Sequence, residues 1–173
     1  GQNHTRKLPS SSDTSLKRLS ALAAKDPRIG AQVPDLFAML KGILERLEKE
    51  PITVRIKNRA NKEMDVKVGK FGLQAIIMID LGDANDLPIF PALFYTIDKG
   101  DTSILARFIE RRYNQFNTGV SMMTFVMDAS SGATRARDAQ IKRQAKTALL
   151  GDTMNFPFPE LGEAFGNPDL GDK

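Results

Sequence analysis

Apolar residues recur every three or four positions through most of this chain, which is the spacing that places them on one face of an α-helix. The clearest run follows Pro34-Asp35, where proline suits the first helical turn, and contains Leu36, Phe37, Leu40, Ile43, Leu44 and Leu47. The same spacing predicts helices over residues 13–25, 71–81, 89–99, 101–116, 120–127 and 133–150. The pattern therefore predicts a mainly α-helical protein with about six to seven helices.

One segment follows a different period. Residues 52–57 alternate strictly between apolar and polar, and Met64, Val66 and Val68 alternate with Asp65 and Lys67 after a polar turn. Alternation of period two is typical of half-buried strands, so residues 52–68 are predicted to form a β-hairpin. An isolated two-stranded ribbon is marginal in water. We therefore expect the hairpin to lie on helices or on something outside this chain.

The two ends of the chain differ from its middle. Residues 5–12 are polar and are expected to be extended, with Asp13 as the cap of the first helix. Residues 151–173 have no helical or strand period, although they contain Phe156, Phe158, Leu161, Phe165 and Leu170. We therefore expect three parts, namely a polar arm over 1–12, a helical domain over 13–150, and a segment over 151–173 that is either a coil packed on a surface or a connector into a missing body.

Composition excludes several kinds of chemistry. The chain has 173 residues with 41% apolar content, enough for one domain with a core, but it has no cysteine and a single histidine, His4. Disulfides, thiolate metal sites and histidine-rich zinc sites are thereby excluded, and neither a Gly-x-Ser-x-Gly elbow nor a phosphate-binding glycine loop occurs. Asp80, Asp83 and Asp86 are expected to act as caps and turn residues. We expect no catalytic residue, cofactor or metal on this chain.

The formal net charge of +4 raises the question of a nucleic-acid partner. The densest basic stretch holds Arg135, Arg137, Lys142, Arg143 and Lys146, without interleaved aromatic residues for base stacking. A solvated helix face is favoured, and a stand-alone binding module for nucleic acid or an acidic protein is the alternative. Since no apolar run reaches membrane-spanning length, we expect a soluble protein without membrane contact, either secreted or cytoplasmic.

Stretches at both ends carry a resemblance to a known family. They are Asn3-His4-Thr5-Arg6-Lys7-Leu8-Pro9-Ser10, then Leu150-Gly151-Asp152-Thr153-Met154-Asn155-Phe156-Pro157-Phe158-Pro159-Glu160, and finally Gly166-Asn167-Pro168-Asp169-Leu170-Gly171-Asp172. These stretches resemble the borders of the cap, or lid, region of α/β-hydrolases of the tripeptidyl and prolyl aminopeptidase type. Between them the resemblance is mainly one of helix pattern.

The resemblance implies a function for the chain within a larger enzyme. The chain would be a helical lid without the α/β core sheet, with residues 1–12 and 151–173 as connectors to that core. The serine nucleophile, acid and base would lie outside these residues. Its partner would be the catalytic core of the same parent protein, and the substrate a peptide or a small acyl molecule. The lid would cover the active site and shape its specificity.

The candidate substrate-lining residues lie in one short segment, where Met122, Met123, Phe125 and Met127 would form an adaptable apolar surface or ordinary core. Aminopeptidases of the family resemble each other in a Cys-x-Glu/Asp stretch whose acid is expected to hold the substrate's amino group. Here Ala129 stands where that cysteine is expected, and Asp128 is the nearby carboxylate. Peptidase and esterase specificities both remain open.

Overall fold

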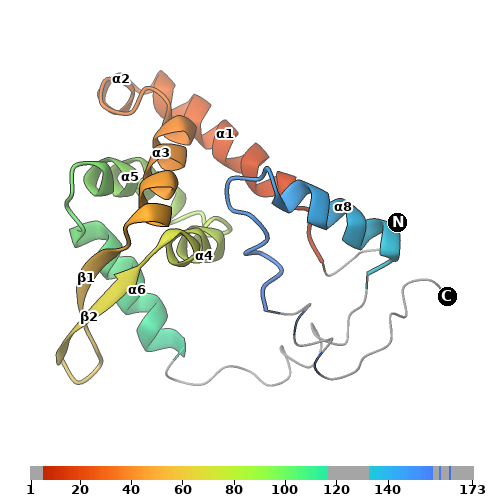
Figure 1. Cartoon of the computed structure of the whole chain (residues 1–173). Coiled ribbons are helices and arrows are strands. Elements are labelled where there is room, and N and C mark those ends of the chain that lie inside the picture. Colours follow the sequence, from red (N-terminus) through yellow and green to blue (C-terminus); the bar gives the residue numbers. More distant parts are fainter. Residues whose placement is uncertain (1–5, 117–132, 158–159, 161–163, 165–173) are drawn as a thin grey trace. The chain divides into compact units, whose positions relative to one another are not determined.

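The computed structural model describes residues 6–116, 133–157, 160 and 164 (Figure 1). Within these residues it contains seven α-helices, one short 3-10 turn and one two-stranded antiparallel hairpin, and no larger sheet. This confirms the predicted fold class. The helix expected over 120–127 lies outside the described residues.

The chain divides into two compact units. Residues 14–118 form the larger unit, and residues 1–13 together with 119–173 form the smaller one. The larger unit holds α2 (Pro27–Gly30), α3 (Leu36–Lys49), β1 (Ile52–Lys57), β2 (Glu63–Val68), α4 (Lys70–Asp80), η1 (Leu87–Ile89), α5 (Phe90–Asp98) and α6 (Ser103–Phe116). The first helix, α1 (Ser10–Lys25), begins in the smaller unit and continues into the larger one, and α8 (Arg135–Ala145) belongs to the smaller unit.

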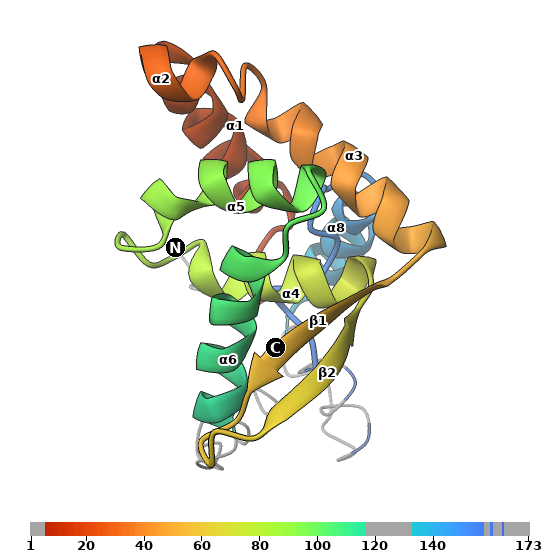
Figure 2. The same ribbon diagram turned by 90° about the vertical axis from the view of Figure 1, so that its left-hand side faces the viewer.

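The core of the larger unit is built by four helices and one strand. α3 packs against α4 and α5, while α6 packs against α5 and β1 (Figure 2). The apolar positions that set the helical period supply the fully buried side chains, among them Leu40, Leu73, Ile77, Phe90, Phe94 and Leu105. Burial of such side chains stabilises each by roughly 1.5–3 kcal/mol relative to exposure. The periodic spacing therefore identifies the packed faces.

The hairpin has the predicted limits, and helices support it. Val54 pairs with Val66 and Ile56 with Met64 in the antiparallel register, and the side chains of Val54 and Ile56 are buried. The backbone N–H of Lys57 donates to Oε1 of Glu110 on α6 at 2.7 Å. The ribbon thus gains within the chain the support that a two-stranded sheet needs.

The first helix starts earlier than predicted. It begins at Ser10, where the backbone N–H of Ser11 donates to the Leu8 carbonyl and the hydroxyl of the buried Ser12 donates to the Pro9 carbonyl. Asp13 therefore does not cap this helix. Its carboxylate instead accepts a hydrogen bond from the Leu149 backbone N–H at 2.9 Å, a partner far away in the sequence.

The other helix limits depend on local caps. Asp101 accepts from the Ser103 N–H at the start of α6, as expected from the sequence. Asp35 accepts from the Ala38 N–H and caps α3, so Pro34 lies before this helix and not in its first turn. Thr134 caps α8, which ends at Ala145 rather than continuing to Leu150, because residues 146–152 form turns. Among the described helices, none has both the length and the apolar character needed to cross a bilayer.

The exposure of α4 also differs from the prediction. Its apolar sequence indicated burial on more than one side, yet Phe71 is 50% exposed and Ile79 44% exposed. Leu73 and Ile77, which lie one turn apart, are the residues that face the core. The high apolar content of this helix therefore exceeds what its packing uses.

Candidate functional site

The predicted substrate-lining residues lie outside the described part of the chain. Met122, Met123, Phe125, Met127 and Asp128 all belong to residues 117–132. The described helix α6 ends at Phe116, six positions before Met122 in the sequence. Two features of the larger unit and one of the smaller unit provide the chemistry that the structure does describe.

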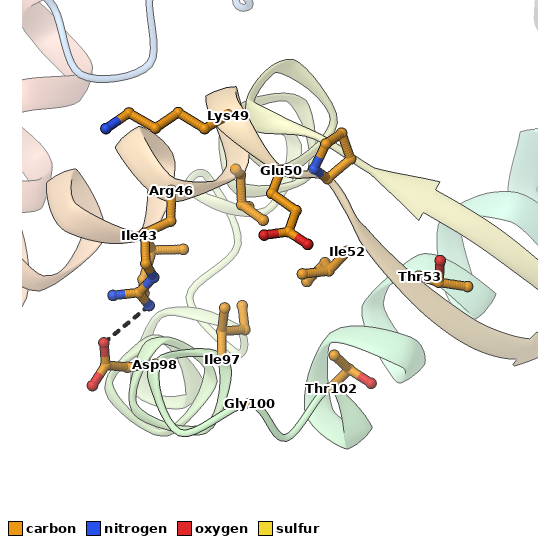
Figure 3. Close-up of a pocket in the computed structure, with 12 residues that line it drawn as sticks. Ile43, Arg46, Lys49, Glu50, Ile52, Thr53, Ile97, Asp98, Gly100 and Thr102 are labelled. Carbon is orange, nitrogen blue, oxygen red and sulfur yellow. Dashed lines mark hydrogen bonds and ion pairs between the residues drawn. The ribbon is translucent and has the colours of Figure 1, made fainter.

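The first feature is a cleft of about 700 Å³ in the larger unit (Figure 3). The C-terminal end of α3, the first residues of β1, and the turn between α5 and α6 surround it. Its walls are formed by both apolar and charged side chains and by one glycine, namely Ile43, Arg46, Leu47, Lys49, Glu50, Pro51, Ile52, Thr53, Ile97, Asp98, Gly100 and Thr102. The volume is in the range of small-molecule sites.

Some of the charged side chains in this cleft form ion pairs and others do not. Nη2 of Arg46 lies 3.0 Å from Oδ1 of Asp98, so these two side chains balance each other at the rim. In Figure 3 the carboxylate of Glu50 extends into the cleft between Arg46 and Ile52, while the Lys49 ammonium points away from it. Within the described residues the Glu50 carboxylate forms no ion pair within 4.0 Å.

Backbone geometry fixes one edge of the cleft. α5 ends in a Schellman motif in which the Gly100 N–H donates to the Ile97 carbonyl and the Asp101 N–H donates to the Thr96 carbonyl. Gly100 has φ +82°, a conformation that glycine adopts without strain. The two hydrogen bonds and a glycine at the positive-φ position therefore stabilise the turn that closes the cleft.

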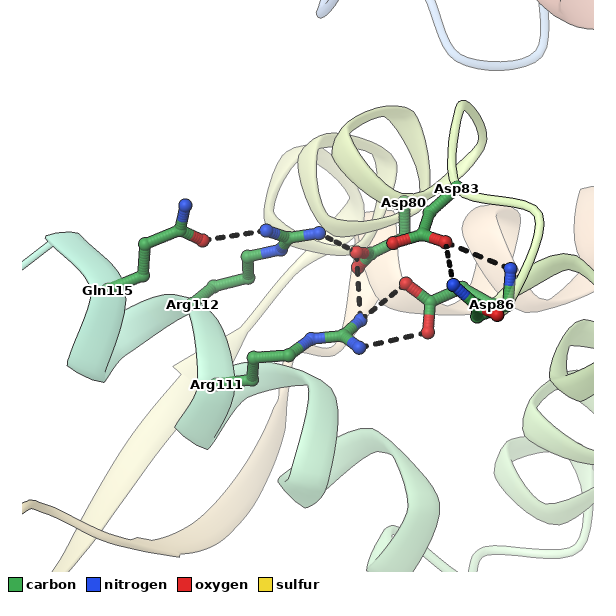
Figure 4. A network of polar contacts seen from close by, with 7 residues as sticks. Asp80, Asp83, Asp86, Arg111, Arg112 and Gln115 are labelled. Atoms are coloured by element: carbon green, nitrogen blue, oxygen red, sulfur yellow. Dashed lines mark hydrogen bonds and ion pairs between the residues drawn. The ribbon is translucent and has the colours of Figure 1, made fainter.

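The second feature is a cluster of four charged residues at the far end of α6 (Figure 4). Arg111 donates to both carboxylate oxygens of Asp86, at 2.9 and 2.7 Å, and to Oδ1 of Asp80 at 2.9 Å. Arg112 also pairs with Oδ1 of Asp80 and donates to Oε1 of Gln115 at 2.7 Å. Two buried carboxylates are therefore matched by two guanidiniums, and α6 is tied to the end of α4 and the following loop.

The surroundings shift the pKa values of these carboxyls in opposite directions. Burial raises the pKa of Asp80, and the hydrogen bond from Arg112 and the charges of both arginines oppose that effect. The hydrogen bond from Arg111 lowers the pKa of Asp86. The difference is consistent with the geometry, since Asp86 receives a bidentate pair whereas Oδ2 of Asp80 has no hydrogen-bond partner among the described residues.

Sequence reasoning described only one of the three aspartates correctly. Asp83 is a turn residue, since its carboxylate accepts hydrogen bonds from the backbone and side chain of Asn85. Asp80 and Asp86 are instead buried ion-pair partners, which corrects the expected capping role. The sequence gives no direct sign of partners 25 to 32 positions away. In the described part of the chain no group of three or more acidic or histidine side chains is arranged to hold a metal ion.

The third feature joins an N-terminal segment and a C-terminal segment of the described residues within the smaller unit. Oδ1 of Asn155 accepts from the Lys7 backbone N–H at 2.8 Å, and Nδ2 of Asn155 donates to the Lys7 carbonyl at 2.9 Å. Arg6 pairs with Asp138 on α8 at 2.8 Å, and Arg137 donates to the Arg6 carbonyl. Asn155 is buried, and its side-chain amide is hydrogen-bonded to both the N–H and the carbonyl of Lys7. The amide therefore links the two segments.

Comparisons with protein families, curated proteins and solved structures give no significant match to this chain. The resemblance described from the three terminal stretches therefore stays a prediction. The function has to be argued from the residues and contacts described above.

Proposed function

We propose that this chain is the lid of an α/β-fold serine hydrolase with a peptide or small acyl substrate. In this proposal the catalytic core of the same parent protein is the partner of the lid, and it supplies the nucleophile, the acid and the base. The lid excludes water from the reaction and selects substrates by the shape of its apolar underside.

The observation that carries the proposal is the pair of hydrogen bonds between Asn155 and Lys7. An inserted domain has to leave its host and return to it at neighbouring points, so its two ends must lie side by side. Lys7 belongs to the leader stretch and Asn155 to the Asn-Phe-Pro-Phe-Pro-Glu stretch, which are two of the segments that resemble the borders of such lids. The contact supports an insertion because it joins these two segments in particular.

The charged cluster of Asp80, Asp86, Arg111 and Arg112 ties the last two turns of α6 to the end of α4 and the loop after it. The predicted substrate-lining segment follows α6 in the sequence and lies outside the described residues.

The proposal is tested by extending the sequence in both directions and expressing the complete protein. We expect a Gly-x-Ser-x-Gly elbow upstream and a histidine downstream, with a fluorophosphonate probe labelling the complete protein and not the 173-residue chain. Flanking sequence without an elbow serine, or labelling of the isolated chain, would contradict the proposal.

A second measurement concerns the lining segment. In the complete enzyme, Met123→Ala and Phe125→Ala should change the relative kcat/KM values for short and long acyl esters more than they change the melting temperature. The matched control is Leu22→Ala, which truncates a 58% exposed side chain on α1 and should leave the substrate ranking unchanged. Loss of stability with an unchanged ranking would place both residues in the core.

A further inference from the structure

The cleft between α3, β1 and the α5–α6 turn is not used by the lid proposal, and its electrostatics favour a particular kind of ligand. Two helix C-termini meet there, because Lys49 ends α3, Asp98 ends α5, and both residues line the cleft. Each helix C-terminus carries a partial negative charge from its aligned peptide dipoles. The backbone therefore makes this cleft attractive to cations.

The side chains strengthen this preference. Arg46 is balanced by Asp98 at 3.0 Å, and Asp98 also lies 3.6 Å from the Lys99 ammonium. The Lys49 ammonium points away from the cleft centre, whereas the Glu50 carboxylate extends into it (Figure 3). Glu50 is therefore the charged group available to a ligand, and it is negative.

The floor of the cleft sets the shape of the ligand. Ile43, Leu47 and Ile97 are buried side chains at its base, and Ile52 is half-buried beside them. Apolar surface of this kind favours a hydrocarbon chain. A ligand that is complementary both to the negative charge of Glu50 and to this apolar floor has a cationic head and an aliphatic stem.

We propose that this cleft binds a primary alkylammonium group, with the ammonium on Glu50 and the hydrocarbon stem over Ile43, Leu47 and Ile97. Both a free aliphatic amine and a lysine side chain of a polypeptide present this chemistry. The inference is independent of the lid proposal, since it uses none of the residues assigned to substrate.

The experiment titrates the 173-residue chain with n-hexylamine and follows the backbone amide resonances by two-dimensional NMR. Shifts should concentrate at Glu50, Thr53 and Gly100, and n-hexylamine should bind about fivefold more tightly than 1-hexanol, the factor given by one charge pair about 4 Å apart in water. N-acetyl-lysine amide forms a second arm that separates a side-chain ligand from a free amine. Binding in either arm at these resonances that is tighter than the binding of 1-hexanol supports the proposal.

Glu50→Gln removes the carboxylate charge at an exposed position, so the variant should fold normally. It should bind hexylamine and hexanol equally, while the control Glu45→Gln, on α3 but outside the cleft, should retain the fivefold difference. Equal binding of hexylamine, hexanol and hexanoate to the wild-type chain would overturn the proposal. Preference for hexanoate would overturn it as well, because Arg46 and Lys49 would then dominate the site.

Discussion

Asp86 shows how much a single charged residue contributes to this structure. It is only 2% exposed, and both of its oxygens accept hydrogen bonds from Arg111. The variant Asp86→Asn should lose about 2 kcal/mol of unfolding free energy at pH 6, the range for hydrogen bonds to charged groups. Urea unfolding followed by circular dichroism measures this loss.

The same variant should show a characteristic pH dependence. The hydrogen bond from Arg111 lowers the pKa of Asp86 in the folded state below its unfolded value of about 3.9. The stabilisation is therefore complete above about pH 4 and is lost as the pH falls through the lowered folded-state pKa. The stability difference between wild type and Asp86→Asn should shrink between pH 6 and pH 3.

A control for this effect is Asp65→Asn. Asp65 pairs with Arg55 across the hairpin, but both side chains are at least half exposed, so solvent screens the pair. Its removal should change the urea midpoint little at pH 6. An equal loss in the two variants would show that burial does not strengthen the Asp86 contacts.

At the residue scale, sequence reasoning succeeds where the partner of a side chain is local. Asp101 caps a helix whose first N–H groups lie two positions away, so its role could be predicted. The partners of Asp80 and Asp13 are instead set by tertiary packing, through Arg112 and the Leu149 N–H. Asn155 and Lys7 are likewise far apart in the sequence. Asn155 was singled out only because it lies in a stretch that carries the family resemblance.

Two glycines on neighbouring helices should respond oppositely to the same substitution. A Cβ on Gly42, in the middle of α3, would meet nothing within 4 Å, whereas a Cβ on Gly30 would lie 2.5 Å from the Ala24 carbonyl oxygen. Gly42→Ala should stabilise the chain by about 0.8–1 kcal/mol because alanine is the better helix former. Gly30→Ala should destabilise it by about 1–3 kcal/mol through overpacking.

Thermal and urea unfolding measure the stability of the two alanine variants, and each variant is the control for the other. Stabilisation by Gly30→Ala would mean that α2 and the end of α1 are not packed as described. Destabilisation by Gly42→Ala would mean that this face of α3 is covered. The comparison therefore tests the arrangement of the first three helices.

At the element scale, the existence of helices was predictable and some of their limits were not. The period of three to four positions locates α3, α5 and α6 because their apolar faces are buried in the core. α1 starts three residues before the predicted position, since the turn at Leu8-Pro9 already initiates it. α8 stops five residues before its predicted end. Its apolar positions are sparse, so burial of an apolar face does not extend the helix into the turns that follow.

At the scale of the whole molecule, the fold class was predictable, whereas no sequence signal marked residue 118 as the end of the larger unit. The compact unit over residues 14–118 contains the hairpin and its helical supports, and the first and last parts of the chain form the other unit. The predicted substrate-lining residues lie within 117–132, outside the described residues. The cleft at Glu50 was missed because its lining comes from two segments, residues 43–53 and 97–102, that only the fold brings together.

The lid proposal and the binding-module alternative predict different behaviour toward nucleic acid. α8 presents Lys142 and Arg143 to solvent, but Arg137 is bonded to the Arg6 carbonyl, and no aromatic residue is interleaved for base stacking. We therefore expect the 173-residue chain to bind labelled duplex DNA no more tightly than a Kd of about 10⁻⁴ M at 150 mM salt. Fluorescence anisotropy between 50 and 200 mM salt measures this, with Lys142→Gln/Lys146→Gln as the matched variant. Micromolar binding that weakens steeply with salt and is lost in that variant would favour the binding module over the lid.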